Sequence, residues 1–182
     1  ESRIDGLAMV DASTLKILMS NECAARVYGF DSVEEATGVY ALDFFHPEDR
    51  DRALEHISVN MFEKDTKQLN EFRTITKDGR EKWIEAVGVV IEYQGRTAGL
   101  ASFRDITERK RIEKALRESE EKLRLTFESI EDSIIVIDPQ GYVLDANQAA
   151  TCTAGFEDRG QVIGINAFDL VSPKDRDRMM QD

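Results

Sequence analysis

Residues 43–52 read DFFHPEDRDR, and residues 169–178 read DLVSPKDRDR. The likeness continues upstream across the first 50 residues of the chain, with a shift of 127 and then of 126 positions. Matches this regular indicate an internal repeat, so the chain carries two copies of one folding unit. The matched pairs are Asp5 and Asp132, Asp11 and Asp138, Asn21 and Asn147, Ala24 and Ala150, Gly29 and Gly155, Phe30 and Phe156, Gly38 and Gly164, Ala41 and Ala167, Asp43 and Asp169, and Pro47 and Pro173.

Composition restricts the partners and the compartment. The formal net charge of −12 repels phosphate backbones and anionic membrane surfaces, so we expect no nucleic-acid partner and no direct membrane contact. No run approaches the roughly 20 apolar residues of a membrane span. Cys23 and Cys152 lack the spacing of a metal site or a disulfide scaffold. These features predict a cytoplasmic fragment of a longer protein, whose membrane topology elsewhere stays open.

Both copies open with the same predicted elements. Short apolar runs at residues 7–10 and 15–19 predict a strand pair, and residues 134–137 and 142–144 repeat it. An asparagine suited to a helix N-cap follows each pair: Asn21 in the first copy and Asn147 in the second.

The middle of the first copy is predicted to be helical. Ser32 and Glu35 have the spacing of a capping box, and Pro47 suits the first turn of a longer helix. Three apolar residues recur at helical spacing and should face the core: Leu54, Ile57 and Met61. Three carboxylates should form a solvated face: Glu48, Asp49 and Asp51. Turns at residues 77–79 and 94–95 divide the remainder into three strands of a meander.

Four stretches together resemble PAS domains. They are the helix ending in YGF at residues 28–30, HPEDR at 46–50, KDG at 77–79 and RDITERK at 104–110. In that family an Asp-Ile-Thr segment closes the final strand and leads into an output helix. By this resemblance, residues 1–108 are a complete domain, 109–128 its connector helix, and 129–182 the N-terminal half of a second domain.

The resemblance implies an α+β fold, with a five-stranded antiparallel sheet and helices on one face. It also implies a homodimer that senses a small-molecule ligand or relays a signal to a downstream effector domain in the same polypeptide.

The strand after the KDG turn carries residues that could line a ligand pocket. Side-chain alternation puts Ile84, Ala86 and Gly88 on one face, and the family's layout turns that face toward the helices. The same small residues also suit a core filled by neighbouring aromatic side chains, so both interpretations stay open. Seven residues are candidates for the pocket lining: Phe45, Phe72, Ile84, Ala86, Gly88, Ala101 and Phe103.

The opposite face of this strand is also apolar. It needs a cover, because large apolar patches are rarely left exposed. We expect contacts there with a second subunit or a flanking helix, through Trp83, Val87, Val89 and Ile91.

Three side chains raise the question of a prosthetic group. His56 lies on the long helix, where haem-binding PAS domains carry their iron ligand, but that ligand would fall nearer Ala53 or Leu54. A solvated or core-edge histidine is therefore expected, and His46 fits a helix boundary. Cys23 lacks the Asn-Cys-Arg-Phe-Leu-Gln motif of the light-oxygen-voltage branch. The sequence thus argues against haem and a covalent flavin.

Asp105 and Thr107 are candidates for signal relay. A carboxylate and a hydroxyl at a strand exit can exchange partners between the sheet and the outgoing helix. The alternative is a plain strand end with a helix cap. We find no Gly-rich phosphate loop, zinc-like cluster or nucleophile with its base, so the fragment is predicted to be non-catalytic.

Residues 109–129 contain no Gly or Pro and predict a continuous helix. Apolar and small polar residues recur along it at spacings of four and three, as in the seam of a coiled coil. The polar residues in this seam are expected to keep the stability of a parallel helix pair low, so that a small rotation or register change can transmit a signal. The seam residues are Ile112, Leu116, Ser119, Leu123, Thr126 and Ile130.

The second copy lacks counterparts of the last three strands, so its first strand should present an unpaired edge. We expect residues 131–182 to pack against another chain or the outer sheet face near Val87, Val89 and Ile91.

The function most consistent with these features is a sensory and relay module of a larger signalling protein, most simply a sensor histidine kinase. A purely structural dimerisation spacer, or the sensor of a cyclase or transcription regulator, are the alternatives.

Overall fold

The computed structural model describes residues 5–63 and 68–170. The chain divides into two compact units, Glu1–Glu113 and Lys114–Asp182. Each is described by itself below, as the first unit and the second unit.

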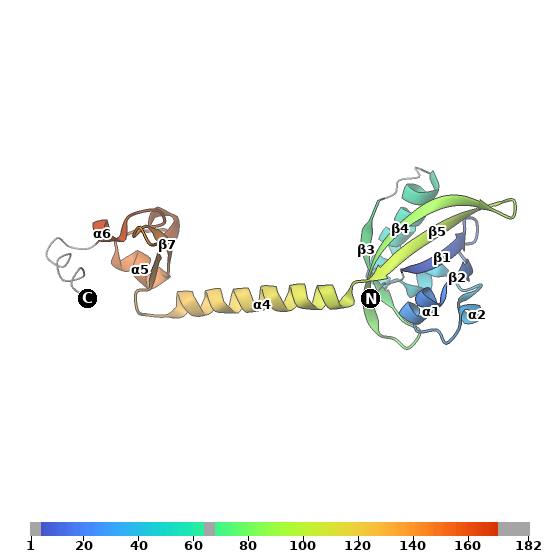
Figure 1. Ribbon diagram of the computed structural model, residues 1–182, viewed down its shortest axis with the longest axis horizontal. Helices are drawn as coiled ribbons and strands as arrows, with labels where there is room; N and C mark the ends of the chain where they lie inside the picture. The colour runs from blue at the N-terminus through green and yellow to red at the C-terminus, as the bar shows by residue number, and fades with distance from the viewer. Residues whose placement is uncertain (1–4, 64–67, 171–182) are drawn as a thin grey trace. The chain divides into compact units, whose positions relative to one another are not determined.

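The first unit contains the expected five-stranded sheet (Figure 1). Every pair of neighbouring strands is antiparallel, and the order is β2-β1-β5-β4-β3. The long hairpin of β4 and β5 turns at Gln94 and Gly95, which both have positive φ, as this kind of hairpin turn requires. The strands are β1 (Gly6–Asp11), β2 (Ile17–Ser20), β3 (Asn70–Ile75), β4 (Glu81–Tyr93) and β5 (Arg96–Asp105).

One part of the predicted strand pair is wrong. Leu15 is not in a strand but in the turn between β1 and β2, with φ of 52°. The Asp11 carboxylate accepts hydrogen bonds from the backbone N–H groups of Ser13 and Thr14, and the Leu15 N–H donates to the Asp11 carbonyl. These local bonds hold a tight turn, so β2 begins only at Ile17.

Short helices connect β2 to β3: α1 (Glu22–Tyr28), α2 (Val33–Ala36), η1 (Ala41–Phe44), η2 (Pro47–Asp49), α3 (Arg50–Glu55) and the π-helical η3 (His56–Glu63). The Asn21 carboxamide caps α1 by accepting from the Ala24 N–H, as predicted. The expected capping box of α2 is only half formed. Ser32 accepts from the Glu35 N–H, but the Glu35 carboxylate accepts from Asp31 instead.

The core of the first unit lies between the sheet and these helices. It contains Tyr28, Phe30, Phe44, Phe45, Phe72 and Phe103, with small residues such as Ala8, Ala24 and Ala53 between them. The rings pack at tilted or edge-to-face angles, with centroids 5.0–5.3 Å apart for the pairs that link α1, η1 and the sheet.

The face of the long helical segment differs from the prediction. Leu54, expected in the core, is 39% exposed, whereas Asp49, Ala53 and His56 are buried. Ile57 packs partly against the core, and the Met61 side chain lies outside the described residues.

Asp49 explains this rotation, because it is not part of a solvated face. Its carboxylate accepts three hydrogen bonds from Arg73 on β3, at 2.9 Å from the backbone N–H and 3.2 and 2.9 Å from the guanidinium. The pair holds Asp49 against the sheet and thereby turns Ala53 and His56 toward the core.

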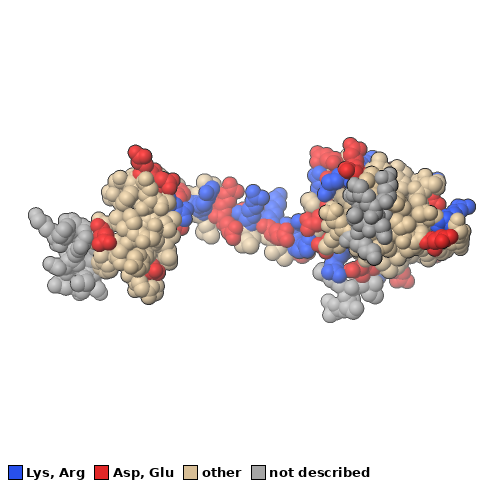
Figure 2. Space-filling model, turned by 90° about the horizontal axis from the view of Figure 1, so that it is seen from above, with Lys and Arg blue, Asp and Glu red and all other residues tan. Residues whose placement is uncertain are grey.

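The predicted connector helix is present as α4 (Thr107–Ser129). Within a single chain its seam side chains are exposed: Ile112, Leu116 and Leu123 by 59–68%. Figure 2 shows acidic and basic side chains alternating along this helix. Ile130, placed in the seam by its spacing, lies beyond the helix end, where its carbonyl accepts a hydrogen bond from the Asn147 carboxamide.

The described part of the second unit repeats the opening of the first. Asn147 caps α5 by accepting from the Ala150 N–H, as Asn21 caps α1. Its carboxamide also donates to the carbonyls of Ile130 and Asp132. The Pro173 helix start lies outside the described residues. The elements are β6 (Ile135–Ile137), β7 (Val143–Ala146), α5 (Gln148–Thr153), η4 (Arg159–Gln161) and α6 (Ala167–Leu170).

The first strands of the two copies differ in burial. Ile135, Val136 and Ile137 of β6 are 38–49% exposed, whereas their equivalents in β1 are all under 9% exposed. β1 pairs with both β2 and β5, but β6 pairs only with β7 among the residues that the structure describes. The edge of β6 is therefore unpaired there, and the expected cover for it stays a prediction.

Candidate functional site

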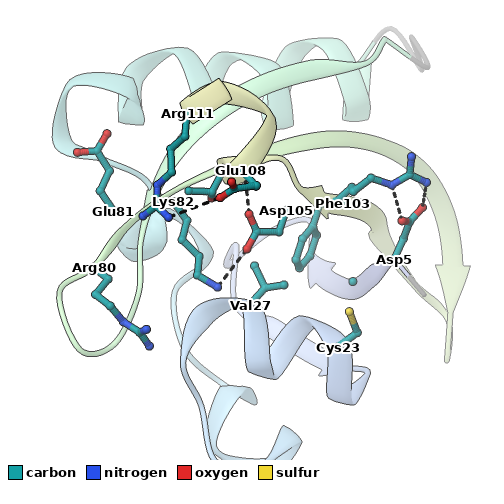
Figure 3. Close-up of a pocket in the computed structure, with 13 residues that line it drawn as sticks. Asp5, Cys23, Val27, Arg80, Glu81, Lys82, Phe103, Asp105, Glu108 and Arg111 are labelled. Atoms are coloured by element: carbon teal, nitrogen blue, oxygen red, sulfur yellow. Dashed lines mark hydrogen bonds and ion pairs between the residues drawn. The ribbon is translucent and has the colours of Figure 1, made fainter. Parts of the chain in front are cut away.

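The exit from the sheet into α4 holds both residues predicted to relay a signal, Asp105 and Thr107. Figure 3 shows Asp105 and Lys82 side by side at this exit. The Asp105 carboxylate accepts a hydrogen bond from the Thr107 N–H at 2.9 Å and pairs with the Lys82 ammonium at 3.1 Å. The Thr107 hydroxyl oxygen accepts from the Trp83 N–H at 3.0 Å. Strand β4 thus contacts the start of the helix through Asp105, the last residue of β5, and Thr107, the first residue of α4.

The charge on Asp105 is stabilised at this position. Partial burial by itself raises the pKa of Asp105, but hydrogen bonds from Thr107 and the charge of Lys82 outweigh it and leave the pKa below its usual value. Asp105 is therefore ionised near neutral pH and holds Lys82. A change that separates Lys82 from Asp105 would also disturb the first residue of α4.

The first turn of α4 makes a second set of contacts with the sheet. The Arg109 guanidinium pairs with Glu71 at 2.6 Å and with Glu85 at 3.1 Å. The Lys110 ammonium pairs with Glu71 at 2.5 Å and lies 5.3 Å from the ring centroid of Trp83. Glu71 and Glu85 are directly opposite each other on β3 and β4. The helix start is thus tied to two strands on the outer face.

The pKa values of these groups shift as their pairing requires. The hydrogen bond from Lys110 lowers the pKa of Glu71, and the same bond raises the pKa of Lys110. The hydrogen bond to Glu85 raises the pKa of Arg109. All three groups therefore stay charged across the physiological pH range.

A cleft of about 620 Å³ lies beside this exit (Figure 3). Its four cations are paired: Lys82 with Asp105, Arg104 with Asp5 at 2.9 Å, Arg111 with Glu108 at 3.7 Å, and Arg80 with Asp78 at 2.7 Å. The Glu81 carboxylate also lines the cleft. Each cation therefore has a carboxylate partner within the domain, and the cleft has no excess of either sign among these pairs. Cys23, Val27 and Phe103 form its apolar wall.

A smaller cavity lies inside the core of the first unit. All seven residues predicted to line a pocket border it, from Phe45 and Phe72 to Ala101 and Phe103. Val87, predicted to face outward, borders it as well. Its volume is about 70 Å³, whereas sites for drug-sized ligands measure roughly 300–1,000 Å³. In this conformation the aromatic side chains fill most of the space.

His56 is one of the polar residues that border this cavity, and it is buried rather than solvated. Its Nδ1 atom lies 3.2 Å from the Asn70 carboxamide nitrogen, and its ring centroid lies 5.6 Å from that of Phe72. Burial lowers the pKa of His56, and the positive charge of Arg52 lowers it further. The imidazole is therefore neutral at physiological pH.

The structure separates the other candidate residues. Trp83 lies under Lys110, while Val87, Val89 and Ile91 are half-buried farther along β4. His46 accepts a hydrogen bond from the Glu48 N–H at the start of η2, as a helix-boundary residue does. Within residues 5–63 and 68–170, no group of three His, Cys, Asp or Glu side chains is arranged to hold a metal ion. The expected absence of haem and covalent flavin stays a prediction.

Sequence reasoning missed Glu71, Glu85, Arg109 and Lys110. In the sequence, Glu71 and Glu85 are charged residues within predicted strands, and Arg109 and Lys110 are basic residues at the start of the predicted helix. Ordinary surface residues share these features, so the sequence did not single them out. Which strand lies beside the helix start is known only from the fold.

Two family comparisons match the chain. The family described as PAS domain matches residues 4–108, and the one described as PAS fold matches residues 121–182. None of the helices in the described part of the chain is long and apolar enough to span a bilayer.

A curated sensor protein is similar to most of this chain. Sensor protein FixL of Bradyrhizobium diazoefficiens is 30% identical over 160 residues, which cover 87% of this chain and 31% of that protein. This chain therefore spans less than a third of that relative.

Two solved structures share the fold. The PAS domain of a Colwellia psychrerythraea protein is 26% identical, with a TM-score of 0.51 over 57% of this chain and 87% of that one. A sensory box histidine kinase/response regulator from Burkholderia thailandensis is 27% identical, with a TM-score of 0.51 over 66% of this chain and 90% of that one. Because the PAS domain match alone covers more than half of the sequence, the chain belongs to the PAS domain family.

Proposed function

We propose that this chain is the sensory and signal-relay module of a larger cytoplasmic signalling protein, and that the parent protein is a sensor histidine kinase. The names of two relatives support this assignment: a sensor protein and a sensory box histidine kinase. In this proposal the fragment itself is non-catalytic and acts on a downstream effector domain of the same polypeptide.

The observation that carries the proposal is the continuous set of contacts between the sheet and α4. Lys82 and Trp83 on β4 contact Asp105 and Thr107, which lead directly into the helix. A shift of β4 relative to β5 would therefore alter the hydrogen bonds that position the first turn of α4. Such a shift is what a change in the core behind these strands would produce.

The relay is tested in the full-length protein by replacing Thr107 with Val. This change removes the acceptor of the Trp83 N–H but keeps the size and shape of the side chain. We expect the difference in autophosphorylation between the stimulated and resting states to fall, with the active site unchanged. Thr14→Val, in the turn between β1 and β2, is the matched control. An unaltered response in Thr107→Val would refute the relay.

The biochemical activity of the full-length protein distinguishes the candidate classes of parent protein. ATP-dependent autophosphorylation is expected of a histidine kinase, whereas nucleotide cyclisation or operator binding would identify a cyclase or a transcription regulator. Only the first outcome agrees with the proposed parent.

A ligand-free dimerisation spacer is the second candidate, favoured by the small volume of the cavity. About 70 Å³ holds little more than two water molecules at their liquid volume of roughly 30 Å³ each. Native mass spectrometry of the purified chain distinguishes the two functions. A bound small molecule supports a sensor, and its absence under all growth conditions supports a spacer.

Homodimerisation is part of the proposal. The exposed side chains of Ile112, Leu116 and Leu123 on α4 and the half-buried Val89 and Ile91 on β4 offer apolar surface to a second copy. Sedimentation equilibrium tests it directly, and a monomer at high micromolar concentration would contradict it.

A further inference from the structure

The last turn of α4 contacts two of the elements that follow it through one carboxylate. Glu128 accepts a hydrogen bond at 2.8 Å from the N–H of Gln148, the first residue of α5. Its other carboxylate oxygen lies 3.9 Å from Nη1 of Arg159, the first residue of η4. A movement of this turn of α4 would therefore disturb both α5 and Arg159.

Arg159 also has a second carboxylate partner. Its Nη2 atom lies 2.8 Å from the carboxylate of Asp145 on β7. The third guanidinium nitrogen, Nε, is buried and has no hydrogen-bond partner among the described residues. Buried polar atoms normally have partners, so this ion pair leaves part of the guanidinium unused at a cost in free energy.

Arg73 in the first unit shows how a guanidinium uses its Nε atom. Its Nε and Nη2 atoms, which lie on one edge of the group, both donate to Asp49, at 3.2 and 2.9 Å. Such bidentate pairs are the common geometry between arginine and a carboxylate. Arg159 directs the same edge toward Asp145 but donates to it from Nη2 alone, while Nη1 faces Glu128. Sharing Arg159 between two carboxylates thus accounts for the unpaired Nε atom.

This set of charges is a feature of the second copy alone. By the 126-residue shift between the copies, Arg159 corresponds to Val33 and Asp145 to Met19. The alignment holds in the structure, because Val33 and Arg159 each begin the short helix at this place in their copy. The fold therefore does not need an ion pair at these positions.

We propose that Arg159 is a positioning residue through which a movement of α4 reaches β7 and α5. In the engaged arrangement, which the structure shows, Arg159 is shared between Glu128 and Asp145. In the released arrangement, α4 carries Glu128 away, and Nε and Nη2 of Arg159 both donate to Asp145. The inference rests on the proposed relay and adds its receiving end.

The two arrangements form a two-state element that α4 can bias. The engaged arrangement keeps the bond from the Gln148 N–H to Glu128 and leaves Nε unpaired. The released arrangement satisfies Nε but takes the acceptor away from Gln148. Because each arrangement gains one hydrogen bond and loses another, a small displacement of α4 is enough to change the balance between them.

NMR spectroscopy of the 182-residue chain observes the pairing directly, through scalar couplings across hydrogen bonds between guanidinium nitrogens and carboxyl carbons. Glu128→Gln keeps an oxygen for the Gln148 N–H but removes the charge that attracts Arg159. We expect a coupling between Nε of Arg159 and the Asp145 carboxyl carbon to appear in Glu128→Gln and to be absent from the unmodified chain. Glu121→Gln, at an exposed position of α4 about two turns earlier, is the matched control and should match the unmodified chain.

Autophosphorylation of the full-length protein tests the coupling. Glu128→Gln favours the released arrangement and Asp145→Asn favours pairing with Glu128, so the two variants should shift the resting output in opposite directions. A merely structural role would shift both in the same direction. Arg159→Val, which introduces the side chain of the first copy, should lower the ratio of stimulated to resting output roughly two- to fivefold, the range of a partly exposed ion pair. Arg159→Lys keeps the charge but loses the Nε–Nη2 edge, and should lower the ratio as well.

The inference and the proposed relay fail in different ways. If the coupling between Nε and Asp145 is already present in the unmodified chain or is missing from Glu128→Gln, the inference is refuted. The same holds if Glu128→Gln and Asp145→Asn shift the output in one direction, or if Arg159→Lys responds like the unmodified protein. The relay itself survives these results as long as Thr107→Val lowers the response. If Thr107→Val and Arg159→Val both leave the response unchanged, the relay and the inference fail together.

Discussion

The ion pair between Asp49 and Arg73 should contribute measurably to the stability of the first unit. Asp49 is 7% exposed, and the hydrogen bonds from Arg73 lower its pKa from 3.8 to about 2. Each pKa unit corresponds to about 1.4 kcal/mol, so the shift amounts to about 2 kcal/mol of unfolding free energy. Asp49→Asn removes the charge but keeps the shape, and should lose about this amount at pH 7.

The pH dependence gives the prediction its sign. Because the pKa of Asp49 is lower in the folded state, its stabilisation is complete well above 3.8 and is lost as the pH falls toward 2. The difference between the unmodified protein and Asp49→Asn should therefore shrink to about half at pH 3.

Urea denaturation followed by the fluorescence of Trp83, the one tryptophan of the chain, measures this directly. Asp51→Asn removes a carboxylate from an exposed position in α3, the helix that follows Asp49 directly, and serves as the control. We expect it to change the unfolding free energy by less than about 0.5 kcal/mol. If Asp49→Asn also stays within that range at pH 7, or if its effect is the same at pH 7 and pH 3, the argument is refuted.

Three further predictions concern other parts of the chain. Gly6→Ala should destabilise the first unit by about 1–3 kcal/mol, because a Cβ atom at Gly6 would lie 2.5 Å from the Phe103 ring; urea denaturation that shows no loss would contradict this close packing. Replacing Ser119 and Thr126 together with Leu should strengthen dimerisation and hold the parent protein at one output level, since the two polar layers of the seam become apolar. Sedimentation equilibrium and the autophosphorylation assay check both effects, and unchanged regulation would refute the role of the polar layers. Asn147→Ala should make the second unit more sensitive to protease, because its carboxamide holds four backbone groups around the start of α5; equal digestion rates would show that these bonds contribute little.

Strand β6 shows that an internal repeat predicts a strand but does not predict how deeply that strand is buried. The repeat identifies Ile135, Val136 and Ile137 as equivalents of β1 residues, and the structure shows the two sets with very different burial. A matching sequence therefore produces the same strand but not the same environment, because burial depends on the neighbouring strand. In the first unit that neighbour is β5, which follows β1 by about 90 residues.

Local sequence by itself determined the order of the elements and many of their ends. The N-caps at Asn21 and Asn147 join atoms only three residues apart, and the turn at Gln94 and Gly95 depends on the conformations of two adjacent residues. Side-chain alternation in β4 likewise follows from strand geometry, and Ile84, Ala86 and Gly88, which it places on one face, border one cavity. Interactions of this range need no knowledge of the rest of the fold.

Tertiary structure decided the features that depend on distant partners. Asp49 turns the long helical segment through its bonds to Arg73, 24 residues away, so Leu54 faces solvent and His56 faces the core. Arg109 meets Glu71 and Glu85 only because β3 and β4 lie side by side at the start of α4. The volume of the cavity is likewise a property of the packed aromatic rings. In each case the sequence offers many possible ion-pair or packing partners, and only the folded structure determines which of them lie within contact distance.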